Sequence, residues 1–303
     1  MALSQVQLRS RSGRTAHFAA NAARLICNPR MAGLYLRWQA SRMALQRSPV
    51  SRHGQLRIGN FESFSHFWLW RDGIPPTEMR LLEACRRALP SDRRWIAVDV
   101  GAHLGHFALA LAAIGFDEVH AFEPVADTYA HVQRNIALNA PFADRITAHA
   151  LGVADAPGSA VFAIRDRSSG QSRIATTPDP DGSRRVRCSL TSLGEQFANR
   201  PEALLGNVKI DVEGFETAVI RGARRLLAER RIMFIYAEVI PQALQEAGSS
   251  TAQLITILTA ANFAIVCGTK DHWSDFIGCN LAEALGSSGG TRNVLFAHKA
   301  VLS

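Results

Sequence analysis

Short apolar segments of strand length alternate with amphipathic segments of helical length along most of this 303-residue chain. The predicted strands cover residues 96–100, 119–122, 146–153, 208–212, 232–239, 263–267 and 293–298. The predicted helices cover residues 107–114, 129–138, 217–229 and 254–261. Such alternation is typical of a doubly wound α/β fold, in which helices cover both faces of a mostly parallel sheet. A glycine-rich stretch without a helix separates the last two strands, which indicates that the last strand is antiparallel.

Two segments depart from this alternation. Residues 159–192 hold two β-rich pieces, at 160–164 and 186–190, on either side of a polar loop rich in turn residues. Residues 62–90 hold an aromatic run and then a helix that begins at a proline pair. We therefore expect a helical lead-in over residues 62–90 and the main α/β domain over residues 91–303.

Positive charge is concentrated in residues 1–61, which we interpret as an N-terminal leader. This segment has ten arginines and no lysine or acidic residue, whereas the remaining 24 basic residues are balanced by 26 acidic ones. Its helical spacing of apolar residues suits a basic amphipathic helix on an anionic membrane surface, and a partly disordered arm or an organelle-targeting peptide also fits the composition. Because the rest of the chain carries no excess of positive charge, we expect no nucleic-acid partner.

Composition excludes several classes of protein. At 47% hydrophobic and 20% charged residues, the chain is typical of a globular protein. The five cysteines form no C-x-x-C pair, which argues against a disulfide framework or a zinc site and favours a reducing compartment. No apolar run reaches the ~18 residues of a membrane span, and the N-terminus lacks the apolar core of a secretory signal. We expect a cytoplasmic protein, with peripheral membrane contact through the leader as an open alternative.

The first predicted strand ends in a glycine turn that precedes a helix. In open α/β sheets, ligands bind at the carboxyl ends of the strands, so Gly101 and Gly105 indicate a nucleotide-binding loop. His103 stands where a dinucleotide-binding loop has the glycine that contacts the pyrophosphate. This difference favours S-adenosylmethionine over NAD, and we expect Asp99 to be a negative partner for the ammonium group of that cofactor, directly or through water. An NAD-dependent oxidoreductase remains a less favoured alternative.

Two further acidic residues lie near strand ends on the cofactor side. Glu123 ends the second strand about 18 residues after Gly105, where an acidic residue accepts hydrogen bonds from the ribose hydroxyls. Asp155 follows the third strand, where the chain can approach the adenine, although a turn-forming role is the alternative. The loop, Glu123 and Asp155 together predict an adenosyl-binding site.

The fourth strand carries three ionisable residues on one face near its end. Alternation along a strand places Lys209, Asp211 and Glu213 on the same side, and Glu238 ends the fifth strand. Buried ionisable groups are costly unless they serve a site, although a structural ion-pair ladder is the alternative. Asp211 is the first candidate for a general base or for a residue that orients the cofactor, followed by Glu213, His106 and Glu238. Two carboxylates are too few ligands to predict a metal ion.

These segments together resemble the FkbM family of S-adenosylmethionine-dependent methyltransferases. The resemblance is carried by VDVGAHLGHF, by AFEP with Asn135 downstream, by KIDVEGFE and by Ala237-Glu238. It implies the Rossmann-like fold of class I methyltransferases and methyl transfer to a hydroxyl, often on a sugar or natural product. By position, the residues that match the family's cofactor pocket and its fourth-strand motif are Asp99, Gly101, Gly105, Glu123, Lys209, Asp211, Glu213 and Gly214.

The chain departs from the family pattern at two positions. His103 replaces the usual asparagine of the first motif, and Thr191 replaces an aspartate that commonly precedes the fourth strand. The polar loop 168–172 resembles a family segment that faces the acceptor. We therefore expect methylation of a hydroxyl on a small-molecule or glycan acceptor. The alternative is a non-catalytic binding protein with a vestigial pocket, whose basic leader binds an anionic membrane or RNA.

Overall fold

The computed structural model describes residues 50–53, 56–59, 73–164, 173–174, 184–266 and 292–302. The chain divides into two compact units, and the unit that begins at Val50 contains all of these residues. Our predictions for residues 1–49 lie outside the described residues. Strands β1 (Val50–His53) and β2 (Leu56–Gly59), which we had assigned to the leader, form an antiparallel hairpin within this unit. No helix in the described part is both long and apolar enough to cross a membrane.

Seven strands form the central sheet, in the order β12–β13–β11–β10–β3–β4–β5. Their bounds are β3 (Ile96–Val100), β4 (Glu118–Phe122), β5 (Ile146–His149), β10 (Leu205–Ile210), β11 (Ile232–Val239), β12 (Phe263–Val266) and β13 (Arg292–His298). Strands β5, β4, β3, β10 and β11 are parallel, whereas β13 runs antiparallel to β11 and β12. This order, with its antiparallel last strand, is the class I methyltransferase topology that the sequence predicts. The strand order reverses between β3 and β10, so this is where a ligand site is expected.

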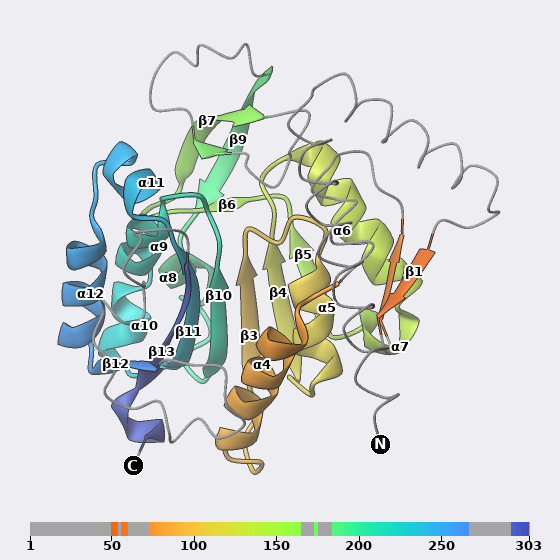
Figure 1. Cartoon of the computed structure of the whole chain (residues 1–303), viewed down its shortest axis with the longest axis horizontal. Coiled ribbons are helices and arrows are strands. Elements are labelled where there is room, and N and C mark those ends of the chain that lie inside the picture. Colours follow the sequence, from red (N-terminus) through yellow and green to blue (C-terminus); the bar gives the residue numbers. More distant parts are fainter. Residues whose placement is uncertain are drawn as a thin grey trace, which may run out of the picture. The chain divides into compact units, whose positions relative to one another are not determined.

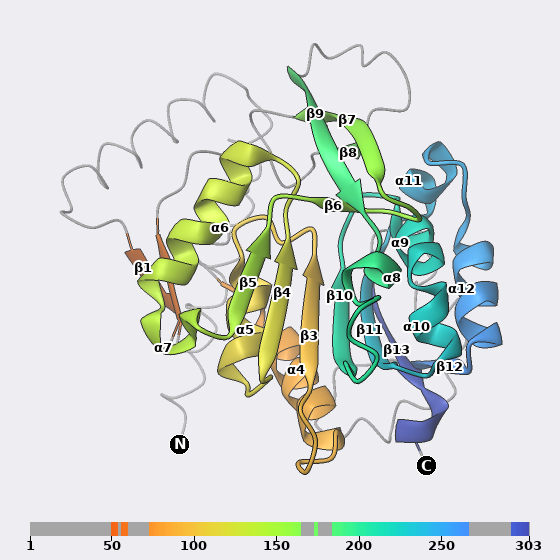
Figure 2. The same cartoon turned by 180° about the vertical axis from the view of Figure 1, so that it is seen from behind.

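Helices cover both faces of the central sheet, as Figures 1 and 2 show from opposite sides. Their bounds are α4 (Pro76–Ala88), α5 (His106–Ala113), α6 (Ala126–Leu138), α7 (Ala140–Ala143), α8 (Leu193–Gln196), α9 (Glu216–Gly222), α10 (Arg224–Ala228), α11 (Pro241–Glu246) and α12 (Thr251–Ala260), and η3 (Lys299–Val301) is a short 3₁₀ helix. Residues of α4, α5 and α6 form one apolar core, and residues of α9, α10 and α12 form the other. Strand β3 is buried on both faces, which explains its nearly continuous apolar sequence.

A smaller sheet of four strands lies beyond the carboxyl ends of the central strands (Figure 1). It consists of β6 (Gly152–Val153), β7 (Gly158–Ile164), β8 (Arg173–Ile174) and β9 (Arg184–Thr191). The antiparallel pairing of β7 with β9 confirms the two β-rich pieces that the sequence predicts. One face of this sheet is apolar and packs on Val125, at the beginning of α6. The predicted acceptor loop 168–172 lies outside the described residues.

Candidate functional site

The loop after β3 packs directly against the end of β10. Gly101 has a φ of +79°, and a Cβ at this position would lie 1.9 Å from the backbone oxygen of Asp211. Gly105 has a φ of +75°, and a Cβ there would lie 3.1 Å from a Val132 methyl group on α6. No side chain fits at Gly101, and little space exists at Gly105, so both glycines allow the close approach that the sequence motif implies. The loop therefore packs against both α6 and the fourth-strand motif.

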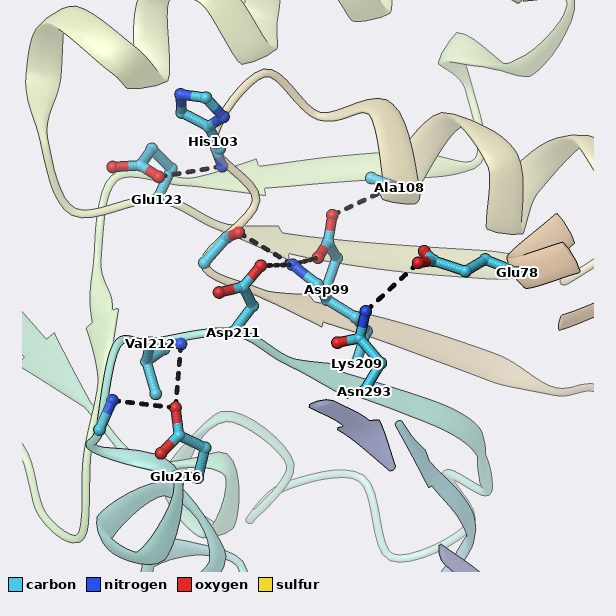
Figure 3. Close-up of polar contacts among 12 residues, drawn as sticks. Glu78, Asp99, His103, Ala108, Glu123, Lys209, Asp211, Val212, Glu216 and Asn293 are labelled. Carbon is cyan, nitrogen blue, oxygen red and sulfur yellow. Dashed lines mark hydrogen bonds and ion pairs between the residues drawn. The ribbon is translucent and has the colours of Figure 1, made fainter. Parts of the chain in front are cut away.

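Asp99 is buried and bound to groups of the protein itself. Its side chain is 0% exposed, Oδ2 accepts the N–H of Ala108 at 3.0 Å, and Oδ1 lies 3.5 Å from Lys209 Nζ. In this arrangement α5 and Lys209 cover the carboxylate of Asp99. A contact of Asp99 with the ammonium group of a cofactor, directly or through water, stays a prediction. Asp99 binds the first turn of α5 and the lysine of the neighbouring strand (Figure 3).

Lys209 lies on β10, beside β3, and its side chain is buried. It is 4% exposed, and Nζ donates to the Gly101 carbonyl at 3.3 Å and to Asp211 Oδ2 at 3.1 Å. Burial lowers the pKa of Lys209, but Asp211 and Asp99 outweigh this effect and raise the pKa to about 12. The ammonium therefore stays charged and cannot accept a proton at neutral pH. It also lies 4.9 Å from the centre of the Phe107 ring, at a distance typical of a cation–π contact.

Glu123 binds the other side of the glycine loop. It lies just after β4, and its side chain is 7% exposed. Oε2 accepts the N–H of His103 at 3.0 Å, and Oε1 accepts the N–H of Val125 at 3.0 Å. Burial raises the pKa of Glu123 to about 7, against the lowering effect of these two hydrogen bonds. A carboxylate has about four lone-pair sites, so each oxygen of Glu123 can accept a further hydrogen bond from a hydroxyl.

Three carboxylates meet where β10 and β11 end. Asp211, Glu213 and Glu238 each have an oxygen within 4.8 Å of the others. Burial raises the pKa of Asp211, but Lys209 outweighs this effect and lowers it, whereas burial and then the charge of Asp211 raise the pKa of Glu238 to about 9. These opposite shifts favour an ionised Asp211 beside a protonated Glu238. Such a cluster can accept a proton from a substrate, and the spacing also suits a divalent cation, for which the sequence predicted too few ligands.

His106 and Asp155 lie at opposite ends of the burial scale. His106 is the first residue of α5 and is buried, with its ring 4.9 Å from that of Phe107. Asp155 is exposed in the bend between β6 and β7, which agrees with its alternative interpretation as a turn former. His103 lies in the glycine loop with a φ of 52°, and burial lowers the pKa of its imidazole to about 3, so the ring is neutral.

Sequence reasoning missed three residues near this edge of the sheet. Glu216, in the first turn of α9, accepts the N–H of Gly214 at 3.1 Å and holds the turn that follows Asp211. Its signal is an acidic residue at the start of a helix that follows a glycine. Glu78 of α4 accepts a hydrogen bond from Asn293 Nδ2 at 3.2 Å, and Asn293 is the pairing partner of Glu238 (Figure 3). No local signal joins these two, because 215 positions separate them.

Comparison with known proteins identifies the family. A family model described as the methyltransferase FkbM domain matches residues 99–265, which is more than half of the chain. Among the curated proteins, none matches this chain significantly in sequence.

Several solved structures match this chain at low similarity. A methyltransferase FkbM from Methylobacillus flagellatus is 16% identical with a TM-score of 0.43, and the match covers 68% of this chain and 44% of that one. A magnesium protoporphyrin IX methyltransferase from Synechocystis, with bound SAM, is 10% identical with a TM-score of 0.40, covering 79% and 86%. An O-methyltransferase from Bacillus cereus, in complex with SAH, is 10% identical with a TM-score of 0.37, covering 74% and 81%. These similarities are too low to assign an activity, and the conclusion rests on the family match: this chain belongs to the methyltransferase FkbM domain family.

Proposed function

We propose that the protein transfers a methyl group from S-adenosylmethionine to a hydroxyl oxygen of a sugar, glycan or natural-product acceptor. One observation carries this proposal beyond family membership: the glycine loop contacts the proposed cofactor residue and the proposed base at the same time. Glu123 binds the loop at His103, and Gly101 of the same loop packs against Asp211. A cofactor over the loop would thus lie between a carboxylate suited to ribose and an acidic cluster suited to the acceptor.

The residues on the cofactor side fit an adenosyl group. Glu123 offers two oxygens with free lone pairs at the end of β4, where the two hydroxyls of a ribose can donate to them. His103 occupies the position at which a pyrophosphate would need a glycine, so the loop favours a cofactor without phosphate. When bound, S-adenosylmethionine supplies an electrophilic methyl group on a sulfonium.

Asp211 is the proposed general base. Its ionised carboxylate would accept the hydroxyl proton of the acceptor, and the methyl group would come from bound S-adenosylmethionine, whose sulfur would be the leaving group. A methyl ether, the demethylated cofactor and a protonated Asp211 would result. Alignment of oxygen and methyl group can contribute ~7–11 kcal/mol, and the base roughly 10²–10⁴-fold in rate.

Lys209 and Glu238 both lower the pKa of Asp211. The ammonium of Lys209 hydrogen-bonds Asp211 at 3.1 Å and keeps it ionised, while Glu238 is protonated and lies in the same cluster. Lys209 is therefore a positioning residue in this proposal, because its atoms are buried against the chain's own groups. His106, which we had grouped with the catalytic candidates, has no role in the proposed step.

The test combines binding and turnover. Calorimetry with S-adenosylhomocysteine should show binding by the wild type, and failure to bind would reject the proposal. Asp211→Asn should retain this affinity within about twofold but lower transfer of labelled methyl to an acceptor fraction of a cell extract by roughly 10²–10⁴-fold. Asp144→Asn makes the same chemical change at an exposed position and should be unaffected. Unchanged turnover of Asp211→Asn would exclude Asp211 as the base.

The same assay tests the acceptor class. A methyl ether is stable to alkali, whereas a methyl ester releases methanol. Label that survives alkaline hydrolysis on a carbohydrate or natural-product fraction supports the proposal, and label that is released as methanol contradicts it. Cofactor binding without transfer to any fraction would favour the alternative of a non-catalytic binding protein.

A further inference from the structure

Two buried asparagines, Asn135 of α6 and Asn139 directly after that helix, lie one turn apart and bind the N-terminal hairpin. Asn139 is 2% exposed and accepts the N–H of Arg57 at 2.8 Å, while its Nδ2 donates to the carbonyl of Arg57 at 2.6 Å. One side-chain amide thus makes the pair of hydrogen bonds that a neighbouring strand would make with β2. Leu56 and Ile58 of β2 are buried in the same region, so the hairpin is docked by both packing and hydrogen bonds.

Asn135 binds the hairpin with only one half of its amide. It is 1% exposed, and Oδ1 accepts the N–H of Gly59 at 2.9 Å. The other half turns the opposite way: Nδ2 donates to the carbonyl of Leu104 at 2.8 Å. Leu104 lies between His103 and Gly105 in the glycine loop and is fully buried. A single amide therefore joins the end of the hairpin to the loop beside the proposed cofactor site.

The loop needs such external contacts because its backbone is strained. Gly101, His103 and Gly105 all have positive φ values, and His103 is not a glycine. A non-glycine residue in this conformation is unfavourable and persists only where the surrounding structure holds it. Glu123 holds the loop at the N–H of His103, and Asn135 holds it at the next carbonyl. The two contacts hold consecutive loop residues, and they come from two different elements, the end of β4 and helix α6.

We propose that Asn135 is a positioning residue of the cofactor site: through Leu104 it keeps the glycine loop in its binding conformation and couples that conformation to the docked hairpin. The effect on affinity rests on the proposed function, since it requires that the loop bind the cofactor. Residues 50–59 then belong to the functional unit, in contrast to the boundary at residue 61 that charge alone suggests.

The experiment compares two matched variants of the full chain. In Asn135→Asp, an oxygen can still accept from Gly59, but a carboxylate oxygen replaces the donor that faced the Leu104 carbonyl. Asn139→Asp makes the same chemical change one turn away, at a residue whose side chain hydrogen-bonds Arg57 of the hairpin and the carbonyl of Asn135. We expect both variants to lose thermal stability to a similar extent. Asn135→Asp alone should weaken S-adenosylhomocysteine binding, by about tenfold, while Asn139→Asp stays within about twofold of the wild type.

A second measurement separates this inference from the proposed function. Hydrogen exchange of the ligand-free protein should show faster exchange of the loop amides 101–105 in Asn135→Asp than in Asn139→Asp. If the wild type does not bind S-adenosylhomocysteine, the proposed function fails, and loop exchange still decides whether Asn135 holds the loop. Should Asn135→Asp not fold, the smaller and uncharged Asn135→Ser is measured in the same way. Equal loop exchange in the variants at the two positions, or equal affinity where the wild type binds, would overturn the proposal.

Discussion

Glu123 makes cofactor binding depend on pH if its carboxylate receives the ribose hydroxyls. Burial raises the pKa of this carboxyl to about 7 in the ligand-free protein, from an ordinary value of 4.5. Ribose hydroxyls donate to the ionised form, so binding requires that Glu123 lose its proton. Affinity should therefore fall as the pH decreases through 7, although ordinary glutamates are fully ionised throughout this range.

The size of the effect follows from the fraction of Glu123 that is ionised. With a pKa of about 7, roughly nine tenths is ionised at pH 8 and about one tenth at pH 6. The Kd for S-adenosylhomocysteine should thus be about tenfold higher at pH 6 than at pH 8. His103, whose backbone N–H binds the same carboxyl, adds no titration in this range, because burial lowers the pKa of its imidazole to about 3.

Isothermal titration calorimetry at pH 6, 7 and 8 measures this dependence directly. At pH 6, binding should release close to one proton, which is detected as a heat that differs between two buffers with different ionisation enthalpies. Glu123→Gln cannot ionise, so it should bind more weakly at pH 8 and show no tenfold change with pH. A constant Kd with no proton release in the wild type would refute the reasoning, as would an unaltered pH dependence in Glu123→Gln.

Two further predictions concern stability. Gly101→Ala should lower the free energy of unfolding by more than the ~1–2 kcal/mol cost of a left-handed alanine, because its Cβ would lie 1.9 Å from a backbone oxygen. The control is Gly115→Ala, at a φ of +101° with no atom within 4 Å of the added Cβ. In denaturant titrations this control should lower the free energy of unfolding clearly less than Gly101→Ala does. Glu216 is buried, and burial raises its pKa from 4.5 to about 7, so the folded protein favours the protonated side chain. The contribution of Glu216 to the free energy of unfolding is therefore fully present below about pH 4.5 and is lost as the pH rises through 7. The stability of Glu216→Gln relative to the wild type should therefore increase between pH 4.5 and 8, by about 3 kcal/mol, and a difference that stays constant with pH would contradict this account.

The repeating pattern along the chain was sufficient to predict the architecture. Period-2 and helical spacing are local properties, and they recur in each strand and helix whichever neighbours surround them. Strand ends that carry glycine or acidic residues were equally visible, so the edge of the sheet with the site followed from the topology of parallel strands. The limits of elements were less accurate: the predicted strand 146–153 divides into β5 and β6, which belong to different sheets, and the predicted helix 217–229 divides at Ala223 into α9 and α10.

The partners of each polar side chain were decided by the tertiary structure. A strand sequence shows that Asp99 and Lys209 are ionisable, but burial beneath α5 and the register of β3 with β10 decide that they bind each other. The bonds from Asn135 to Gly59 and Leu104 span 76 and 31 positions, so no local pattern contains them. The sequence by itself thus determined the strands, the helices, the family and the edge that carries the site. Distances, burial and protonation arise only when segments far apart in the chain pack together, and these properties decide which residues meet a ligand and which hold the site in place.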